Sequence, residues 1–180
     1  MDLNRRRIDQ VADPDFLAEL GSVSLDELRE RRRVLGDLDT ELSYYRRLLH
    51  GRMDLLAFEM RRRRGEEQRS LIEALPDILA DHDGPDAASS LPKELPIEAP
   101  SIPETGRRAV DRALADDFLA RLPSLADAEL EEIQAGLTEV ERDISAQRNV
   151  VYTAHEAILT ELTRRYREGL ADVDGLLSSP

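Results

Sequence analysis

Apolar residues recur at every seventh position in two separate stretches of the chain. The first series is Leu28, Leu35, Leu42, Leu49 and Leu56, and the second is Leu130, Leu137, Ile144, Val151 and Ile158. Three residues further on, a second apolar position recurs at Leu38 and Tyr45 and at Ile133 and Val140. Heptads sustained over about five repeats predict two long helices that zip together along this seam. Because neither helix can bury its seam alone, we expect an all-α fold built on a two-helix coiled coil.

The two heptad series belong to an internal repeat with an offset of 102 residues. The repeat aligns "DFLAELGS" at 15–22 with "DFLARLPS" at 117–124 and continues without a gap to Arg63 and Arg165. Fifteen of these 49 aligned pairs are identical, whereas about three are expected by chance. The chain is therefore predicted to contain two copies of one unit, each a short helix followed by a long one.

Helix-start signals set the expected boundaries in the first copy. Asp13 and Pro14 are typical of the N-cap and first residue of a helix, which we expect over 14–20. Ser24, with a glutamate three residues later, is typical of a capping box. No proline follows until position 76, so we expect the first long helix to span 24–73.

The second copy and the segment between the copies complete the predicted organisation. A short helix is expected at about 108–122, and Ser124 with Asp127 predicts the start of a long helix over 124–170. Residues 76–106 hold six of the nine prolines, seven acids and the only lysine, a composition that predicts a disordered linker. It is either a tether left by duplication or a docking segment. The predicted domains are thus a first repeat unit (1–75), the linker (76–106) and a second repeat unit (107–180).

Charge and composition limit the classes of partner. The chain has 25 basic and 38 acidic residues and a net charge of −13, so we expect no direct nucleic-acid partner. Cysteine is absent, which excludes disulfides and thiolate metal sites and favours a reducing compartment. No stretch approaches the ~20 apolar residues that a membrane span needs. We therefore expect a cytoplasmic protein without a membrane partner.

A polar stripe runs along the shoulder of each seam. In the first copy it consists of Asp39, Ser43, Arg46, His50 and Asp54, and in the second of Glu141, Ser145, Arg148, Tyr152 and Glu156. At 100° per residue the members of one stripe fall within an arc of about 80°. Any long helix has a solvated charged shoulder, but acid, serine, arginine and acid recur at equivalent positions of both copies. This recurrence favours a binding site.

The stripe resembles the E-x3-S-x2-R-x3-Q-x3-D signature that occurs once on each coiled-coil helix of the RsiG-type anti-sigma factors of actinobacteria. Asp39 stands where the signature has Glu, His50 and Tyr152 stand where it has Gln, and Glu156 stands where it has Asp. The resemblance implies that the protein binds cyclic di-GMP and holds a WhiG-like sigma factor inactive. It covers both long helices, about 24–73 and 124–170.

The resemblance also implies a role for each residue of the stripe. Arg46 and Arg148 are assigned to guanine or phosphate, and Asp54 and Glu156 to the guanine edge. Ser43 and Ser145 are assigned to phosphate or to oxygens near the backbone. Asp39 and Glu141 orient the arginines, and His50 and Tyr152 bond to or stack on a base. Arginine forks match the O6 and N7 acceptors of guanine, and carboxylates match its N–H donors. Because a cyclic dinucleotide has two equivalent halves, we expect the two helices to be antiparallel.

An enzyme is not expected. The three histidines, His50, His82 and His155, lack metal-site spacing, and the chain contains neither a phosphate-binding G-x-x-x-x-G-K motif nor a nucleophile elbow. We therefore expect no catalytic and no metal-binding residue. The alternative from another class is a coiled-coil scaffold without a small ligand. Phe16, Leu17, Phe118 and Leu119 either dock a partner or cap the ends of the coil.

Overall fold

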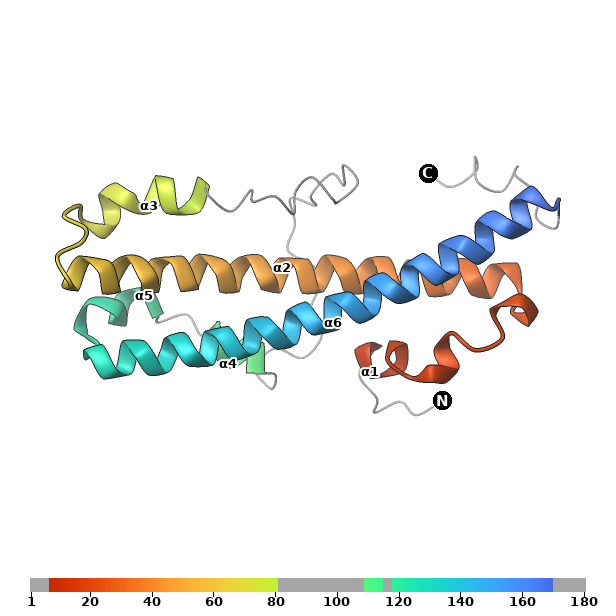
Figure 1. Cartoon of the computed structure of the whole chain (residues 1–180), viewed down its shortest axis with the longest axis horizontal. Coiled ribbons are helices and arrows are strands. Elements are labelled where there is room, and N and C mark those ends of the chain that lie inside the picture. The colour runs from red at the N-terminus through yellow and green to blue at the C-terminus, as the bar shows by residue number, and fades with distance from the viewer. Residues whose placement is uncertain (1–6, 81–108, 115–117, 170–180) are drawn as a thin grey trace. The chain divides into compact units, whose positions relative to one another are not determined.

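The computed structural model describes residues 7–80, 109–114 and 118–169, which contain helices and no strand. In chain order the elements are α1 (Arg7–Val11), the 3-10 helices η1 (Pro14–Phe16) and η2 (Leu20–Ser22), α2 (Leu25–Arg63), α3 (Leu71–Ala80), α4 (Ala109–Ala113), α5 (Phe118–Arg121), the 3-10 helix η4 (Leu122–Ser124) and α6 (Asp127–Arg167) (Figure 1). The predicted all-α fold is confirmed. Over the described parts of the chain, no helix has the length and apolar character that crossing a membrane requires.

The chain forms two compact units. The terminal unit comprises residues 1–42 and 146–180, and the central unit comprises residues 43–145. Each unit therefore pairs one segment of α2 with one segment of α6, and these two long helices supply most of the described residues.

Contacts within each unit show that its paired segments are antiparallel. In the terminal unit Arg29 donates a hydrogen bond to Tyr166, and further along α2 Asp39 lies beside Arg148, earlier in α6. In the central unit His50 contacts Glu141, and Arg63, later in α2, contacts Asp127, earlier in α6. The predicted antiparallel arrangement is confirmed in both units.

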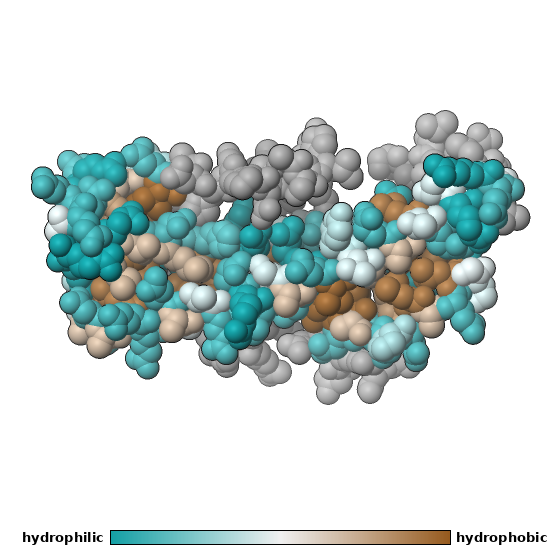
Figure 2. Space-filling view, viewed as in Figure 1, coloured by the Kyte–Doolittle hydropathy of each residue, from teal (hydrophilic) through white to brown (hydrophobic). Residues whose placement is uncertain are grey.

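The heptad seam is the core. Each of the ten predicted residues of the two leucine-rich series is at most 5% exposed, and so are Leu38 and Tyr45. Ile133 and Val140 are only half-buried. Burying one such side chain contributes about 2 kcal/mol. The face drawn in Figure 2 is mostly hydrophilic, with apolar residues visible in separate patches.

The structural repeat extends further towards the N-terminus than the aligned identities. The bounds of α1 and α4 differ by 102 residues, as do those of η2 and η4 and the first residues of α2 and α6. The two copies thus share every one of these elements at the same offset. These offsets agree with the predicted duplication, whereas η1 and α5 do not follow the offset.

The first long helix ends ten residues before its expected limit at 73, because Gly65 terminates it. Gly65 adopts a left-handed backbone with φ of 76°. Its N–H donates to the carbonyl of Arg62, and the N–H of Glu66 donates to that of Arg61. This pair of bonds satisfies the last carbonyls of α2 and turns the chain away from the helix axis.

A separate helix, α3, begins after the turn. Ser70 and Glu73 form a reciprocal capping box, in which the Ser70 N–H donates to the Glu73 carboxylate and the Glu73 N–H donates to the Ser70 hydroxyl. Ala74 is fully buried, and Pro76 lies within the helix. The expected linker over 76–106 is therefore wrong in its first five residues. Residues 81–106 lie outside the described residues.

The expected short helix over 14–20 is divided into η1 and η2. Asp13 caps η1 by accepting a bond from the Asp15 N–H at 3.0 Å, as predicted. Glu19 interrupts the segment because its backbone is left-handed, with φ of 50°. In the second copy, α4, α5 and η4 replace the expected helix over 108–122, and residues 115–117 lie outside the described residues.

The two long helices start with different caps. The Ser24 hydroxyl accepts a bond from the Glu27 N–H at 3.2 Å, which confirms Ser24 as the N-cap, while the Glu27 carboxylate accepts from Arg31 and does not complete the box. The box predicted for Ser124 and Asp127 is wrong, because the Ser124 hydroxyl instead donates to the Arg121 carbonyl. At the start of α6, Glu129 accepts a bond from the Ala126 N–H at 2.7 Å.

Each heptad column ends in an arginine that holds the short segment of the other copy. In the central unit Arg63 donates to the carbonyls of Leu122, Pro123 and Leu125, at 3.2, 3.4 and 2.7 Å. Its Nε also donates to Glu59, which is only 3% exposed. Charge-assisted bonds of this kind are stronger than neutral ones. This arrangement, which we call the arginine clasp, therefore fixes η4 against the end of α2 (Figure 1).

The terminal unit contains the equivalent clasp. Arg165 donates to the carbonyls of Leu20 and Gly21 at 2.7 and 3.2 Å, and its Nε donates to Glu161. Hydrogen bonds from Arg164 and Arg165 lower the pKa of Glu161 to about 2. Glu161 is therefore ionised at all physiological pH values and holds the guanidinium in place.

Removing the terminal clasp is expected to destabilise the fold strongly. Arg165 is 8% exposed, so Arg165→Ala removes a nearly buried ion pair and leaves two carbonyls without their donor, a loss of about 3 kcal/mol in the free energy of unfolding. Arg164→Ala is the matched control, because Arg164 also bonds Glu161 but is largely exposed. Its loss is expected to be about 1 kcal/mol or less. Urea unfolding monitored by circular dichroism measures both, and equal losses would contradict the clasp.

Candidate functional site

The ten residues of the polar stripes are divided between the two units. Six lie in the central unit, and we call them the central cluster: Ser43, Arg46, His50, Asp54, Glu141 and Ser145. Four lie in the terminal unit, and we call them the terminal cluster: Asp39, Arg148, Tyr152 and Glu156. Each cluster draws residues from both α2 and α6.

The central cluster is organised around the Glu141 carboxylate. One of its oxygens, Oε1, accepts hydrogen bonds from Arg46 Nε at 3.2 Å and from the Ser145 hydroxyl at 2.7 Å. The His50 Nε2 atom lies 3.2 Å from the same oxygen. Glu141, Arg46 and Ser145 are all half-buried. A single oxygen thus gathers three polar side chains.

The pKa of Glu141 reflects two opposing effects. Burial of the carboxylate raises the pKa, whereas the hydrogen bonds from Ser145, His50 and Arg46 lower it. The bonds prevail, and the pKa lies below the ordinary value of 4.5. Glu141 is therefore an anion that holds Arg46 in position at neutral pH.

The terminal cluster pairs its arginine more loosely. Arg148 Nε lies 3.7 Å from Asp39 Oδ1, which is close enough for an ion pair but too long for a hydrogen bond. Among the residues that the structure describes, Arg148 Nε is buried and has no hydrogen-bond partner. Such an atom is costly to bury and is satisfied by any acceptor that reaches it.

The two arginine–acid pairs are equivalent under the 102-residue repeat. Arg46 corresponds to Arg148, and Glu141 corresponds to Asp39. In both pairs the arginine of one copy lies beside the acid of the other copy. Sequence reasoning expected these acids to orient the arginines, but it did not show that the pairing crosses between the copies.

The remaining stripe residues are more accessible. Asp54 and Glu156 are exposed, and Ser43 is half-buried. Tyr152 is 66% exposed, although its ring is large and mostly apolar. An exposed aromatic ring one helical turn from an arginine is suited to stacking on a planar ligand.

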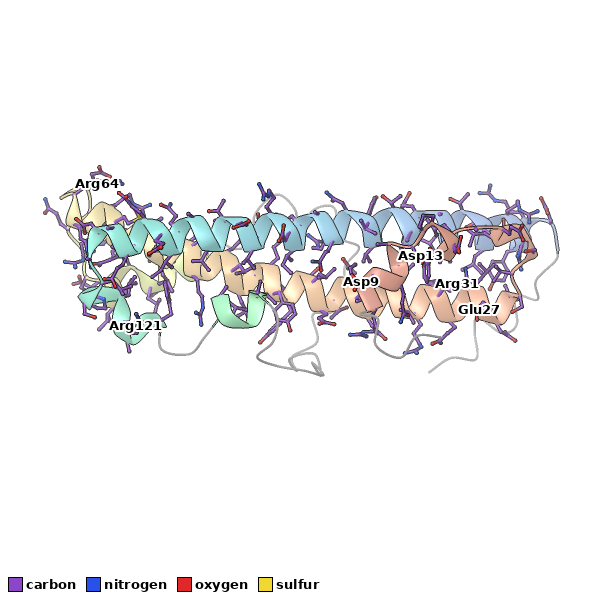
Figure 3. The ribbon with its side chains drawn as sticks, turned by 90° about the horizontal axis from the view of Figure 1, so that it is seen from below. Asp9, Asp13, Glu27, Arg31, Arg64 and Arg121 are labelled. Carbon is purple, nitrogen blue, oxygen red and sulfur yellow. The ribbon has the colours of Figure 1, made fainter. Side chains whose placement is uncertain are left out.

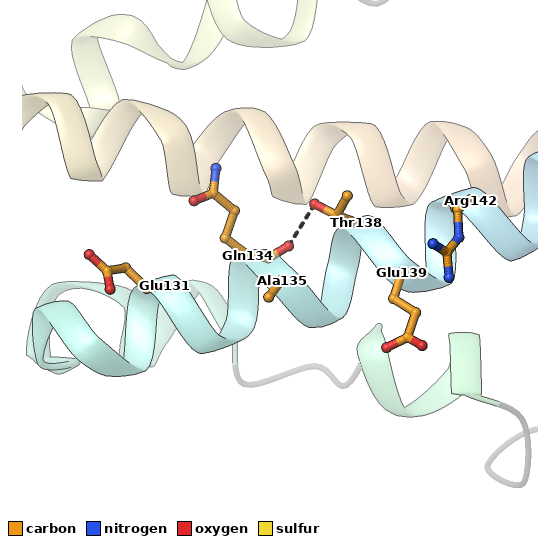
Figure 4. Close-up of a pocket in the computed structure, with 6 residues that line it drawn as sticks. All are labelled: Glu131, Gln134, Ala135, Thr138, Glu139 and Arg142. Carbon is orange, nitrogen blue, oxygen red and sulfur yellow. Dashed lines mark hydrogen bonds between the residues drawn. The ribbon is translucent and has the colours of Figure 1, made fainter.

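Two open depressions lie on α6. One is lined by Glu131, Gln134, Ala135, Thr138, Glu139 and Arg142 and contains no stripe residue (Figure 4). Its Thr138 hydroxyl bonds the Gln134 carbonyl of its own helix. The other includes Glu156 together with Arg164 and Arg167. Because each is lined by consecutive turns of one helix, neither encloses a ligand, and among the described residues no acid or histidine cluster could hold a metal ion.

The phenylalanines of the short segments are engaged within their own units. Arg31 lies over the Phe16 ring at 5.3 Å from its centre and donates a bond to the Phe16 carbonyl. Arg31 also bonds Glu27 one turn earlier on α2 (Figure 3). Arg52 similarly lies over the Phe118 ring at 5.1 Å. These cation–π contacts favour a capping role for both rings over partner docking.

Comparison with known families agrees with the stripe. The family model described as RsiG-like matches residues 14–79, which contain all of the first stripe. The matched segment of the chain is therefore similar to the RsiG-like family, a regulatory family of anti-sigma factors. No curated protein matches the chain.

The lowered pKa of Glu141 predicts a pH-dependent contribution to stability. Because the pKa is lower in the folded than in the unfolded chain, the stabilisation is complete above pH 4.5 and is lost as the pH falls through the folded value. Wild type is expected to be more stable than Glu141→Gln at pH 7, and the difference should shrink below pH 4.5. Thermal unfolding across this range measures it.

Glu139→Gln is the matched control for the pH series, since Glu139 is an exposed carboxylate on α6 in the same unit. It is expected to follow the wild-type profile. A Glu141→Gln deficit that stays constant down to pH 3 would refute the role of the carboxylate charge.

Proposed function

We propose that this protein is an anti-sigma factor that binds cyclic di-GMP through the central and terminal clusters and holds a WhiG-like sigma factor inactive. The observation that carries the proposal is the presence, in each unit, of an arginine beside an acid from the other copy. The RsiG-like match over the first copy supports it. Cyclic di-GMP itself presents two guanines and two phosphates.

The chemistry of the clusters suits this ligand. A guanidinium donates two parallel bonds to guanine O6 and N7 or to a phosphate, and a carboxylate accepts from guanine N1 and N2. We assign the first role to Arg46 and Arg148 and the second to Asp54 and Glu156. Ser43 and Ser145 donate to phosphate, and His50 and Tyr152 stack on or bond to a base. Asp39 and Glu141 hold the arginines.

Ligand binding is proposed to act on the sigma-binding surface through the helix pairs. A ligand bound at either cluster supplies acceptors to the arginine of that cluster and offsets the repulsion among its acids. Helices that carry bound ligand have fewer alternative arrangements, so the conformation that binds the sigma factor becomes more populated. Couplings of this kind typically amount to about 1–3 kcal/mol.

Removing both arginines is expected to abolish nucleotide binding. Titration calorimetry should show saturable binding of cyclic di-GMP to wild type and none to Arg46→Ala/Arg148→Ala. In a thermal-shift assay, ligand at 100 times its dissociation constant should add about 2.7 kcal/mol to the free energy of unfolding of wild type. The double variant should not respond.

Arg47→Ala/Arg142→Ala is the matched control, because it removes two exposed arginines from the same helices and the same net charge. It should bind like wild type. If both double variants lose the same affinity for cyclic di-GMP, the loss reflects net charge and not the positions of Arg46 and Arg148.

The sigma-factor step needs its own measurement. Size-exclusion chromatography of the protein with a WhiG-type sigma factor should show a complex that strengthens in the presence of cyclic di-GMP. A scaffold without a small ligand predicts no response to the nucleotide and little effect of the arginine substitutions on either assay.

A further inference from the structure

The two clusters differ in how strongly their arginine is already engaged by protein groups. We infer that the terminal cluster, through Arg148, accounts for more of the affinity for a guanine nucleotide than the central cluster does through Arg46. This inference rests on the proposed function. It concerns how the ligand affinity is distributed between the two clusters.

In the central cluster a ligand must compete with the protein. Glu141 accepts a bond from Arg46 Nε at 3.2 Å while also accepting one from Ser145 at 2.7 Å, and His50 lies 3.2 Å from the same oxygen. Freeing Arg46 for a ligand disturbs this network. The gain from each new bond is therefore reduced by the loss of an existing one.

In the terminal cluster no hydrogen bond to Arg148 Nε has to be broken. This buried atom lacks a hydrogen-bond partner among the described residues, and its acid, Asp39, remains at 3.7 Å. An acceptor from a nucleotide that reaches Nε satisfies a donor that the protein leaves unsatisfied. The whole strength of a charge-assisted bond then adds to binding.

The difference between the clusters follows from one methylene group. The position that carries Glu141 in the second copy carries Asp39 in the first. A carbon–carbon bond adds about 1.5 Å of reach, which exceeds the difference between the 3.7 Å and 3.2 Å contacts. The shorter acid keeps its negative charge near Arg148 without bonding its Nε.

The residues one turn further on reinforce the difference. His50 lies against the acid of the central cluster, whereas its equivalent, Tyr152, is 66% exposed. Tyr152 is thus available to stack on a base, while His50 is already engaged by Glu141. The difference between His50 and Tyr152, like that between Glu141 and Asp39, therefore favours ligand binding at the terminal cluster.

Exchanging the two acids tests the inference. Asp39→Glu should close the terminal pair, which raises the melting temperature of the ligand-free protein and lowers its affinity for cyclic di-GMP about tenfold. Glu141→Asp should loosen the central pair, which lowers the melting temperature and leaves the affinity unchanged or higher. A structural role alone would make affinity follow stability, so opposite directions of the two readouts are diagnostic.

Single arginine variants provide a second measurement. Calorimetry with cyclic di-GMP should show a loss at least tenfold larger for Arg148→Ala than for Arg46→Ala. With GMP as a one-base probe, binding should disappear in Arg148→Ala and persist in Arg46→Ala. Circular dichroism verifies that both variants fold.

The outcomes separate the inference from the proposed function. If wild type binds cyclic di-GMP but Arg46→Ala costs as much affinity as Arg148→Ala, or if Asp39→Glu leaves the affinity unchanged, the clusters are equivalent and the inference is wrong. If wild type binds no cyclic di-GMP at all, the proposed function is itself wrong, and the inference is overturned with it.

Discussion

Each long helix carries a column of apolar heptad residues, and the described structure depends on burying this column away from water. In each described unit the other long helix does so, because a short segment such as the five-residue α1 cannot cover five heptad positions. The antiparallel pairing that results brings Arg46 beside Glu141 in one unit and Arg148 beside Asp39 in the other. It also brings the arginine at the end of each column to the short segment of the opposite copy. Packing of the seam thus positions both arginine–acid pairs that the proposed function uses.

The polar shoulder of the seam differs from an ordinary solvated helix face. Its acids and arginines pair between copies, and salt bridges formed only within one helix are mostly exposed, as at Arg33 and Glu30. Half-burial makes the paired charges more responsive to a ligand, because bonds formed away from water are stronger. The same half-burial leaves one donor, Arg148 Nε, without an acceptor. Where every hydrogen-bond donor is already bonded by protein side chains, an anion binds only by replacing an existing bond.

The sequence predicted the seam, the duplication and the stripe, because all three are periodic and periodicity survives without knowledge of tertiary contacts. It failed at positions decided by one local conformation. Because no proline occurs between position 24 and position 76, the first long helix was predicted to reach residue 73. Gly65, with its left-handed backbone, ends it earlier. The capping box at Ser124 was wrong, although the 102-residue offset itself aligns Ser24 with Ala126 and not with Ser124. The arginine clasps were missed, yet Arg63 and Arg165 were the last identical pair of the alignment and occupy the next heptad position after Leu56 and Ile158.

The clasps have a consequence for how such a chain arises. Each copy supplies the arginine that secures the other, so a single copy has an unsecured short segment and an uncovered column. Reciprocal contacts of this type are those of a symmetric homodimer, in which one surface recognises itself. When two protomers are joined in one polypeptide, the reciprocal contacts remain, but the two surfaces no longer need to have the same sequence. Aspartate on one side and glutamate on the other is a difference that a homodimer, with one sequence for both sides, cannot have.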